Sequence, residues 1–190
     1  MRILAISGSL RAGSHNTDLL QAAAAVAPDG IDVELYDGLK EIPPYDADDD
    51  VPGGQPPPVQ RFKDALAEAD AVLIATPEYN SSIPGVLKNA LDWASRPHAT
   101  NPLRGKPAAV IGASTGMFGA VWAQSDARKI LSTIGARVVD RELPVPEADE
   151  RFDSDGTLRD PEVEAQLSEL LVDLAEAVEA REAALARAAA

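Results

Sequence analysis

The sequence predicts a doubly wound α/β fold, in which one five-stranded parallel sheet carries helices on both faces. Short runs rich in Val, Ile and Leu alternate along the chain with stretches whose apolar residues recur at helical spacing. The runs are nearly continuous in apolar residues, as expected for strands buried on both faces of a parallel sheet. The length of 190 residues, of which 45% are apolar, suits one domain with a sizeable core.

Each predicted strand is a short apolar run bounded by polar or turn-forming residues. Because successive runs are separated by a helical stretch, their connections are crossovers and the strands are parallel. The predicted strands are residues 2–6, 31–36, 71–76, 108–112 and 137–140, the last of which continues to Leu143.

The predicted helices follow the strands one by one. Their apolar residues recur three or four positions apart, so that each helix has one face for the core. The predicted helices are residues 18–27, 60–68, 84–94, 120–134 and 161–180.

Two segments lie outside this pattern. Residues 37–58 hold six prolines (Pro43, Pro44, Pro52, Pro56, Pro57 and Pro58) together with a cluster of aspartates (Asp46, Asp48, Asp49 and Asp50), a composition unsuited to a helix or an inner strand. We expect a long surface loop there, either a lid or binding loop or a solvated acidic connector. Residues 1–181 are predicted to form a single domain, and residues 182–190 a fraying helix end.

The composition excludes several classes of function. A net charge of −14, from 31 acidic and 17 basic residues, repels nucleic acid. The absence of cysteine excludes disulfides, thiol catalysis and thiolate metal sites. The apolar runs are too short for a membrane span, and Met1 leads into a strand without a signal-peptide pattern, so we expect a cytoplasmic protein without membrane partners.

The first loop, residues 7–17, has the character of an anion site. It joins a predicted strand to a predicted helix, where unpaired N–H groups favour a phosphate. Arg11 adds a charge-assisted hydrogen bond, and further donors are Ser9, Ser14, Asn16 and Thr17. The alternative interpretation is a polar turn in which Ser14 or Asn16 simply caps the helix.

Two further loops follow predicted strands and meet the first at the carboxyl ends of the sheet, where ligands of such folds bind. The second loop runs from Pro77 to Gly85. It offers apolar surface from Tyr79 and Ile83 and polar groups from Glu78, Asn80 and Ser82, as walls for a planar heteroaromatic ring with a polar edge. The alternative is a proline-bounded turn that leads into the next helix.

The third loop, residues 113–119, allows close backbone approach at Gly116 and Gly119, while Ser114 and Thr115 either cap the following helix or bind the ligand. Ser114 also lies in a G-x-S-x-G pattern typical of hydrolases. In those enzymes the catalytic histidine follows the serine, whereas His15 and His98 precede it. Both histidines are expected to be solvated or capping residues.

Other nucleotide and metal patterns are missing from the sequence. A Walker loop and a G-x-G-x-x-G fingerprint are absent, which favours a mononucleotide over a dinucleotide. No metal site is expected, since the histidines are far apart in sequence and the run from Asp46 to Asp50 lacks the spacing of a calcium loop.

These residues resemble the NADPH-dependent FMN reductase family, which includes bacterial quinone and chromate reductases with a flavodoxin-like fold. Residues 7–11, followed by Ser14 and Asn16, resemble the family's loop for the FMN phosphate. Residues 77–80, 82–85 and 87–93 resemble its isoalloxazine-binding loop and the following helix. Residues 42–46 and 105–107 are also similar to the family. The chain departs from many relatives at Trp122, which replaces an arginine, and at Ser81, which replaces an aromatic residue.

The resemblance implies a flavodoxin-like strand order of 2-1-3-4-5 and an NAD(P)H-dependent reductase that uses FMN, with NADPH or NADH as electron donor. It implies ping-pong transfer of hydride to a small-molecule acceptor such as a quinone or flavin, with no catalytic acid or base from the protein. It also implies a homodimer or homotetramer, with the helix at 84–93 near the interface. The alternative is a redox-inactive flavin-binding or electron-carrier protein. The expected cofactor-binding residues are Ser9, Arg11, Ser14, Asn16, Thr17, Pro77, Glu78, Tyr79, Asn80, Ser81, Ser82, Ile83, Ser114, Thr115 and Gly116.

Overall fold

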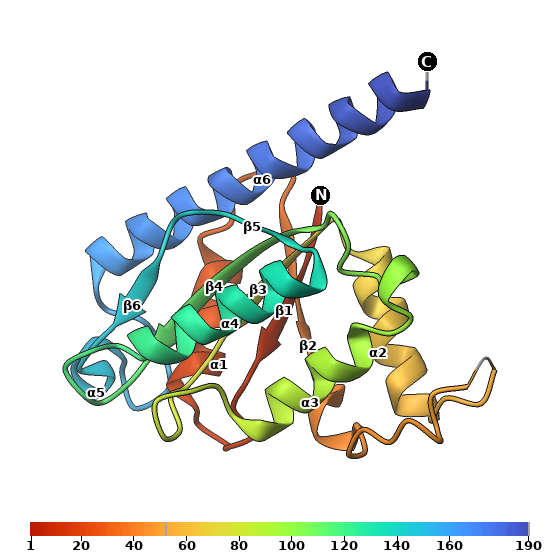
Figure 1. Cartoon of the computed structure of the whole chain (residues 1–190). Coiled ribbons are helices and arrows are strands. Elements are labelled where there is room, and N and C mark those ends of the chain that lie inside the picture. Colours follow the sequence, from red (N-terminus) through yellow and green to blue (C-terminus); the bar gives the residue numbers. More distant parts are fainter. Residues whose placement is uncertain (52, 190) are drawn as a thin grey trace.

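Strands and helices alternate along the chain in the computed structural model, which describes residues 1–51 and 53–189 (Figure 1). The strands are β1 (Arg2–Ser7), β2 (Asp32–Tyr36), β3 (Ala71–Ala75), β4 (Pro107–Ala113), β5 (Arg137–Val138) and β6 (Leu143–Val145). The α-helices are α1 (His15–Ala25), α2 (Pro57–Glu68), α3 (Gly85–Ala94), α4 (Val121–Ile134), α5 (Ala148–Arg151) and α6 (Pro161–Ala189), and the 3₁₀ turns are η1 (Gly38–Glu41) and η2 (His98–Thr100).

The sheet has the predicted order. Its strands are hydrogen-bonded in the sequence β2-β1-β3-β4-β5, and all pairings are parallel. This is the flavodoxin-like arrangement, in which the strand order reverses between β1 and β3. The predicted fold class is therefore confirmed.

The fifth strand differs from the single run expected at 137–140. It is split into β5 and β6, which both pair with β4 on the edge opposite β3. Arg137 pairs with Pro107, an offset of 30 residues, whereas Leu143 pairs with Ile111, an offset of 32, so two extra residues bulge out between the two strands. The Arg128 guanidinium of α4 donates to the bulge carbonyls of Val139, Asp140 and Arg141, which compensates for the interrupted ladder.

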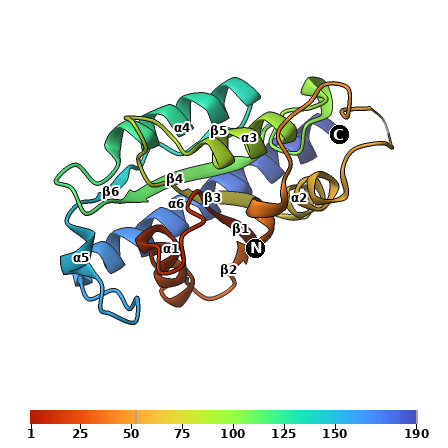
Figure 2. The ribbon, with the colours of Figure 1, turned by 90° about the horizontal axis from the view of Figure 1, so that it is seen from below.

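The helices cover both faces of the sheet (Figure 2). One face packs α2, α3 and α4 around the fully buried Phe62 and Trp93. The other face packs α1 and α6 through leucines such as Leu19 and Leu170. Because the inner strands β1, β3 and β4 are buried on both faces, their continuous apolar runs are accounted for.

Several element boundaries differ from the sequence prediction. Helix α1 begins at His15 rather than Asp18, and α2 begins at Pro57, so the surface loop predicted for 37–58 is shorter and also contains η1. Proline is compatible with the first helical turn, where its missing N–H is not needed. Helix α6 continues through the described part of the segment 182–190, and fraying there stays a prediction. Pro52 and Ala190 lie outside the described residues.

The first part of the proline- and aspartate-rich segment 37–58, here named the acidic loop, is held against α3. The Asn89 side chain accepts a hydrogen bond from the Tyr45 amide at 2.8 Å and donates one to the Pro43 carbonyl at 2.8 Å. The buried Trp93 indole donates to the same carbonyl at 2.9 Å. This part of the loop is therefore an ordered strap along α3.

Candidate functional site

The three predicted loops meet at the carboxyl ends of the strands. Together they line a cavity of about 210 Å³. Its lining residues are Ser9, Arg11, Ser14, His15, Asn16, Pro77, Glu78, Tyr79, Ala113, Ser114 and Thr115. The cavity lies where the strand order reverses, which is the usual ligand position in an open parallel sheet.

The first loop forms a cradle for an anion. Gly13 has a φ of +64°, a conformation that glycine adopts without strain, and it turns the chain into α1. Ser14 takes the N-cap position, but its side chain makes no capping hydrogen bond. The loop is therefore not the simple serine-capped turn of the alternative interpretation.

The groups of this cradle fit a phosphate. Ser14 is only 3% exposed and lines the cavity, yet its hydroxyl has no hydrogen-bond partner among residues 1–51 and 53–189. Within the same residues, the amides of Ser14, His15 and Asn16 donate no hydrogen bond. Arg11 lies exposed at the rim and adds a positive charge. Donor groups without partners at a helix N-terminus are what an anionic ligand would satisfy.

Two of the predicted donors have structural partners. The Asn16 amide group donates to the Ala113 carbonyl and accepts from the Ala113 amide, both at 3.0 Å. This pair of bonds clamps the start of α1 to the end of β4. The Thr17 hydroxyl lies 2.9 Å from the Ser7 hydroxyl and does not line the cavity. What remains for a ligand near Asn16 is chiefly its backbone N–H.

His15 was not predicted as a site residue, but it forms part of the cavity wall. Its Nε2 lies 2.9 Å from the Asp149 carboxylate of α5, and its ring stacks on Phe152 with centroids 5.4 Å apart. Asp18 lies on its other side, 3.6 Å from Nδ1. Burial raises the pKa of the Asp18 carboxyl, and the charges of His15 and Arg11 partly oppose that shift. Local sequence spacing does not indicate this pair, because Asp149 lies 134 positions from His15 along the chain.

The second loop contains a tight turn from Tyr79 to Ser82. The Tyr79 amide donates to the Ser82 carbonyl at 2.9 Å, and the Ser82 amide donates back at 3.2 Å. Asn80 and Ser81 have φ values of 53° and 62°, as a type I′ turn requires. They form the exposed apex and do not line the cavity, and their predicted cofactor contact stays a prediction.

Two side chains of this loop fasten it to α4. The Glu78 carboxylate accepts hydrogen bonds from the amides of Trp122 and Ala123, at 3.2 and 3.4 Å. It thus caps the helix N-terminus, where a negative charge is favourable. The Ser82 hydroxyl donates to Asp126 at 2.7 Å.

Ile83 does not line the cavity, and its predicted contact with the cofactor stays a prediction. It is 7% exposed and packs into the core beneath the loop. Its apolar side chain belongs to the same core cluster as the buried residues of α3.

The third loop is held by the bulged fifth strand and α5. The Ser114 amide donates to the Val145 carbonyl at 3.0 Å, and the Ser114 carbonyl accepts from Ala148 at 3.0 Å. The Ser114 hydroxyl accepts from the Gly116 amide at 3.0 Å. Among the described residues it has no hydrogen bond to a histidine, so the G-x-S-x-G pattern does not form a serine–histidine pair. Gly116 supports this turn from outside the cavity.

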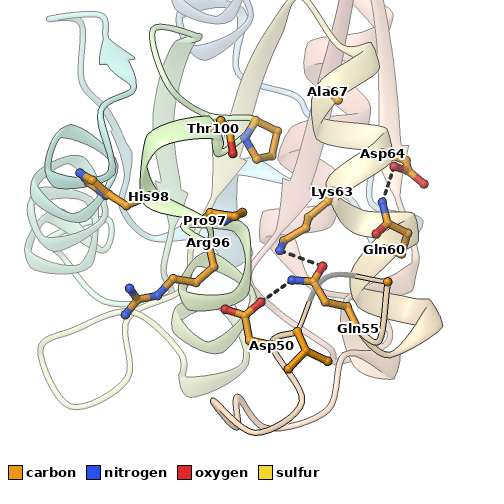
Figure 3. Close-up of a pocket in the computed structure, with 13 residues that line it drawn as sticks. Asp50, Gln55, Gln60, Lys63, Asp64, Ala67, Arg96, Pro97, His98 and Thr100 are labelled. Carbon is orange, nitrogen blue, oxygen red and sulfur yellow. Dashed lines mark hydrogen bonds between the residues drawn. The ribbon is translucent and has the colours of Figure 1, made fainter.

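A larger cavity of about 690 Å³ lies elsewhere, between α2, the acidic loop and the segment around η2. Lys63 donates to Gln55 at 3.0 Å, and Gln55 donates in turn to Asp50 (Figure 3). Burial lowers the pKa of Lys63, and the Asp50 charge opposes this. None of the predicted site residues lines this cavity, so volume alone does not identify the site.

Two features are absent from the described residues. No cluster of three or more histidine and carboxylate side chains is arranged to hold a metal ion within residues 1–51 and 53–189. Over the same residues, no helix combines the length and apolar character that a membrane crossing requires.

Comparisons with known proteins agree with the fold and the loops. A protein of Pseudomonas aeruginosa named NAD(P)H-dependent FMN reductase is 46% identical over 161 residues, which cover 84% of this chain and 85% of that protein. A 2-hydroxy-1,4-benzoquinone reductase of a Burkholderia species is 39% identical over 159 residues, covering 83% of this chain and 85% of that protein. The solved structure of FerB, a flavoenzyme NAD(P)H:(acceptor) oxidoreductase from Paracoccus denitrificans, superposes with a TM-score of 0.84 at 34% identity over 95% of this chain and 98% of that one.

The family model described as NADPH-dependent FMN reductase matches residues 1–150, which include all three loops. The match confirms the predicted type of enzyme and its cofactors, FMN and NAD(P)H. On these grounds the chain belongs to the NADPH-dependent FMN reductase family.

Proposed function

We propose that this protein oxidises NADPH or NADH and reduces a quinone, a flavin or a similar small acceptor in two half-reactions of a ping-pong mechanism. The observation that carries the proposal is the cradle at the start of α1, in which the buried Ser14 and the neighbouring amides have no partner among the described residues. The names of the relatives support the same class of reaction, since they include an FMN reductase and a benzoquinone reductase.

FMN, when bound, supplies reversible acceptance of a hydride, which lets donor and acceptor react in turn. The protein supplies position and electrostatics. Ser9, Ser14 and Arg11 would hold the phosphate together with the amides at the start of α1. Tyr79 and the turn from Pro77 would contact the ring, with Ser114 and Thr115 at its edge. We propose that all of the predicted cofactor-binding residues contact FMN.

The chain's residues need not move a proton at the reacting atoms. Glu78, the carboxylate of the second loop that lines the cavity, is bound to two amides of α4 and thereby engaged in a structural role. Backbone N–H groups near Glu78 to Asn80 would stabilise negative charge on the reduced cofactor.

The absorption spectrum of the purified protein is the first test. We expect a yellow protein, or a colourless one that turns yellow with added FMN and bleaches when NADPH is added without oxygen. Addition of a quinone should restore the colour, and initial rates at several concentrations of both substrates should give parallel double-reciprocal lines. Flavin that binds but does not bleach would instead favour the alternative, a flavin-binding or electron-carrier protein. A protein that binds no FMN would contradict the proposal.

We also propose that the protein is a homodimer or homotetramer and acts in the cytoplasm. Helix α3 (Gly85–Ala94) is the proposed neighbour of the subunit interface. Light scattering at micromolar concentration should give a mass of at least twice the 20.0 kDa of one chain. A monomeric mass would contradict the oligomer.

A further inference from the structure

The largely exposed aromatic side chains of the described residues come from segments at the carboxyl end of the sheet. The chain has only two Trp, three Tyr and three Phe. Over residues 1–51 and 53–189, those that are largely exposed are Tyr79, Phe118 and Trp122, at 52, 55 and 48%. All three come from the second loop, the third loop or the first turn of α4. Exposed aromatic residues that gather in this way indicate a binding surface.

This surface adjoins the candidate cavity. Tyr79 lines the cavity, and Glu78, which also lines it, binds the Trp122 amide at 3.2 Å. The Phe118 and Trp122 rings pack edge to face, with centroids 4.9 Å apart and planes inclined at 63°. The exposed Met117 extends the same surface. We name Tyr79, Met117, Phe118 and Trp122 the aromatic rim.

The aromatic rim is held in position by its supports. Glu78 and Ser82 tie the second loop to α4, as described above. Gly119, beside Phe118, has a φ of +55°, and a Cβ atom there would lie 2.6 Å from the Val145 amide nitrogen. The backbone of the third loop is therefore seated against β6, and the rim is preorganised for a ligand.

The charges around the cavity distinguish between classes of acceptor. The one permanently cationic side chain that lines it among the described residues, Arg11, belongs to the phosphate loop. The second and third loops contribute to the lining one charged group, the Glu78 carboxylate, and no cation among the described residues. An anionic acceptor at the rim would meet no positive charge there, whereas a flat uncharged ring would meet aromatic surface.

We propose that Trp122, together with Phe118, determines specificity by binding flat, uncharged aromatic acceptors and disfavouring anionic ones. This inference rests on the proposed function, because it concerns the acceptor of that reaction. For a quinone, NADPH loses a hydride, and the quinone gains this hydride and one proton from solvent to become a hydroquinone.

The test compares two acceptors that differ by one charged group, 1,4-naphthoquinone and 1,4-naphthoquinone-2-sulfonate. The variants are Trp122→Ala, Trp122→Phe and Trp122→Arg, and the control is Leu185→Ala, which removes another exposed apolar side chain far along α6. One readout is KM in turnover with NADPH. The other is the Kd of each quinone for the oxidised protein without NADPH, measured by calorimetry.

We expect Trp122→Ala to raise both KM and Kd for naphthoquinone about tenfold, because an aromatic contact and its buried area are lost. Trp122→Phe should recover most of this loss. Trp122→Arg should bind naphthoquinone more weakly than wild type and the sulfonate about tenfold more tightly. The FMN affinity and the mass in solution of the Trp122 variants should stay unchanged. All values for Leu185→Ala should also stay unchanged.

Unchanged quinone binding in Trp122→Ala would overturn the inference. A change of mass in that variant would also overturn it, because the aromatic rim would then be a subunit interface. If wild type does not oxidise NADPH but the Kd values shift as expected, the proposed function fails while the aromatic rim stands as a binding surface for flat uncharged rings.

Discussion

Replacing Lys106 with methionine should alter how the stability of this protein depends on pH. Lys106 directly precedes β4 and is only 3% exposed, and its Nζ donates to the carbonyl of Ala69, where α2 ends. The pKa of Lys106 is lowered from its usual 10.5 to about 8, chiefly by burial and additionally by the charge of Arg181, while Asp70 opposes the shift. The charged form of Lys106 is thus disfavoured in the folded protein.

The sign and size of the effect follow from this shift. The folded protein releases the Lys106 proton at a lower pH than the unfolded chain, so the cost of burying the charge is present below pH 8 and disappears as the pH rises toward 10.5. The full cost is about 3 kcal/mol, at 1.36 kcal/mol for each pKa unit. Between about pH 7 and pH 9.5, the free energy of unfolding of wild type should therefore rise by about 2 kcal/mol relative to Lys106→Met.

Urea unfolding followed by circular dichroism at several pH values in this range provides the measurement. Other groups titrate equally in both proteins, so the difference between the two curves isolates Lys106. Loss of the hydrogen bond to Ala69 lowers the free energy of unfolding of the variant by about 1 kcal/mol at every pH. It does not change how that free energy depends on pH. Lys40→Met, at an exposed position, controls for the loss of a lysine as such. If wild type and Lys106→Met differ by a constant amount across the range, the reasoning is refuted.

Three further substitutions test the site and its supports. Arg11→Ala should weaken FMN binding about tenfold, measured by fluorescence titration of the apoprotein, because a charge-assisted bond to the phosphate is lost; an unchanged affinity would contradict this assignment. Asn16→Leu should lower the free energy of unfolding by about 2 to 4 kcal/mol, because it leaves two buried backbone groups of Ala113 unpaired, and an effect below about 1 kcal/mol in urea would contradict the clamp. Arg128→Ala should cost about 1 to 3 kcal/mol in the same assay by exposing the carbonyls of the bulge at 139–141, and Arg128→Lys should restore only part of the loss.

The sequence was sufficient to predict the fold because its inner strands are buried on both faces. The run at 71–75 is apolar throughout, and this pattern belongs to an inner parallel strand. The fifth strand was less predictable, because the two-residue bulge depends on Arg128, a side chain of another element. The start of α2 was missed because Pro57 and Pro58 were interpreted as loop residues, although proline is compatible with a first helical turn.

The loops of the site were predictable by position, and several roles of their side chains were not. Small and hydroxylated residues after β1 indicated the cradle, and the structure places Ser9, Arg11 and Ser14 in it. The clamp from Asn16 to Ala113 joins residues 97 positions apart, and the contact of His15 with Asp149 spans 134 positions. Such partners are set by the packing of the whole sheet, which local spacing does not reveal.

The clamp between Asn16 and Ala113 has a consequence for the order of events during synthesis. The phosphate loop lies near the N-terminus and leaves the ribosome early, yet its geometry is completed by the end of β4. The third loop in turn is held by backbone hydrogen bonds between Ser114 and both Val145 and Ala148. A nascent chain that ends before these residues contains every residue that lines the cavity, but it lacks the hydrogen bonds that hold the third loop in place. We therefore expect the flavin to be captured only after about four fifths of the chain has been made.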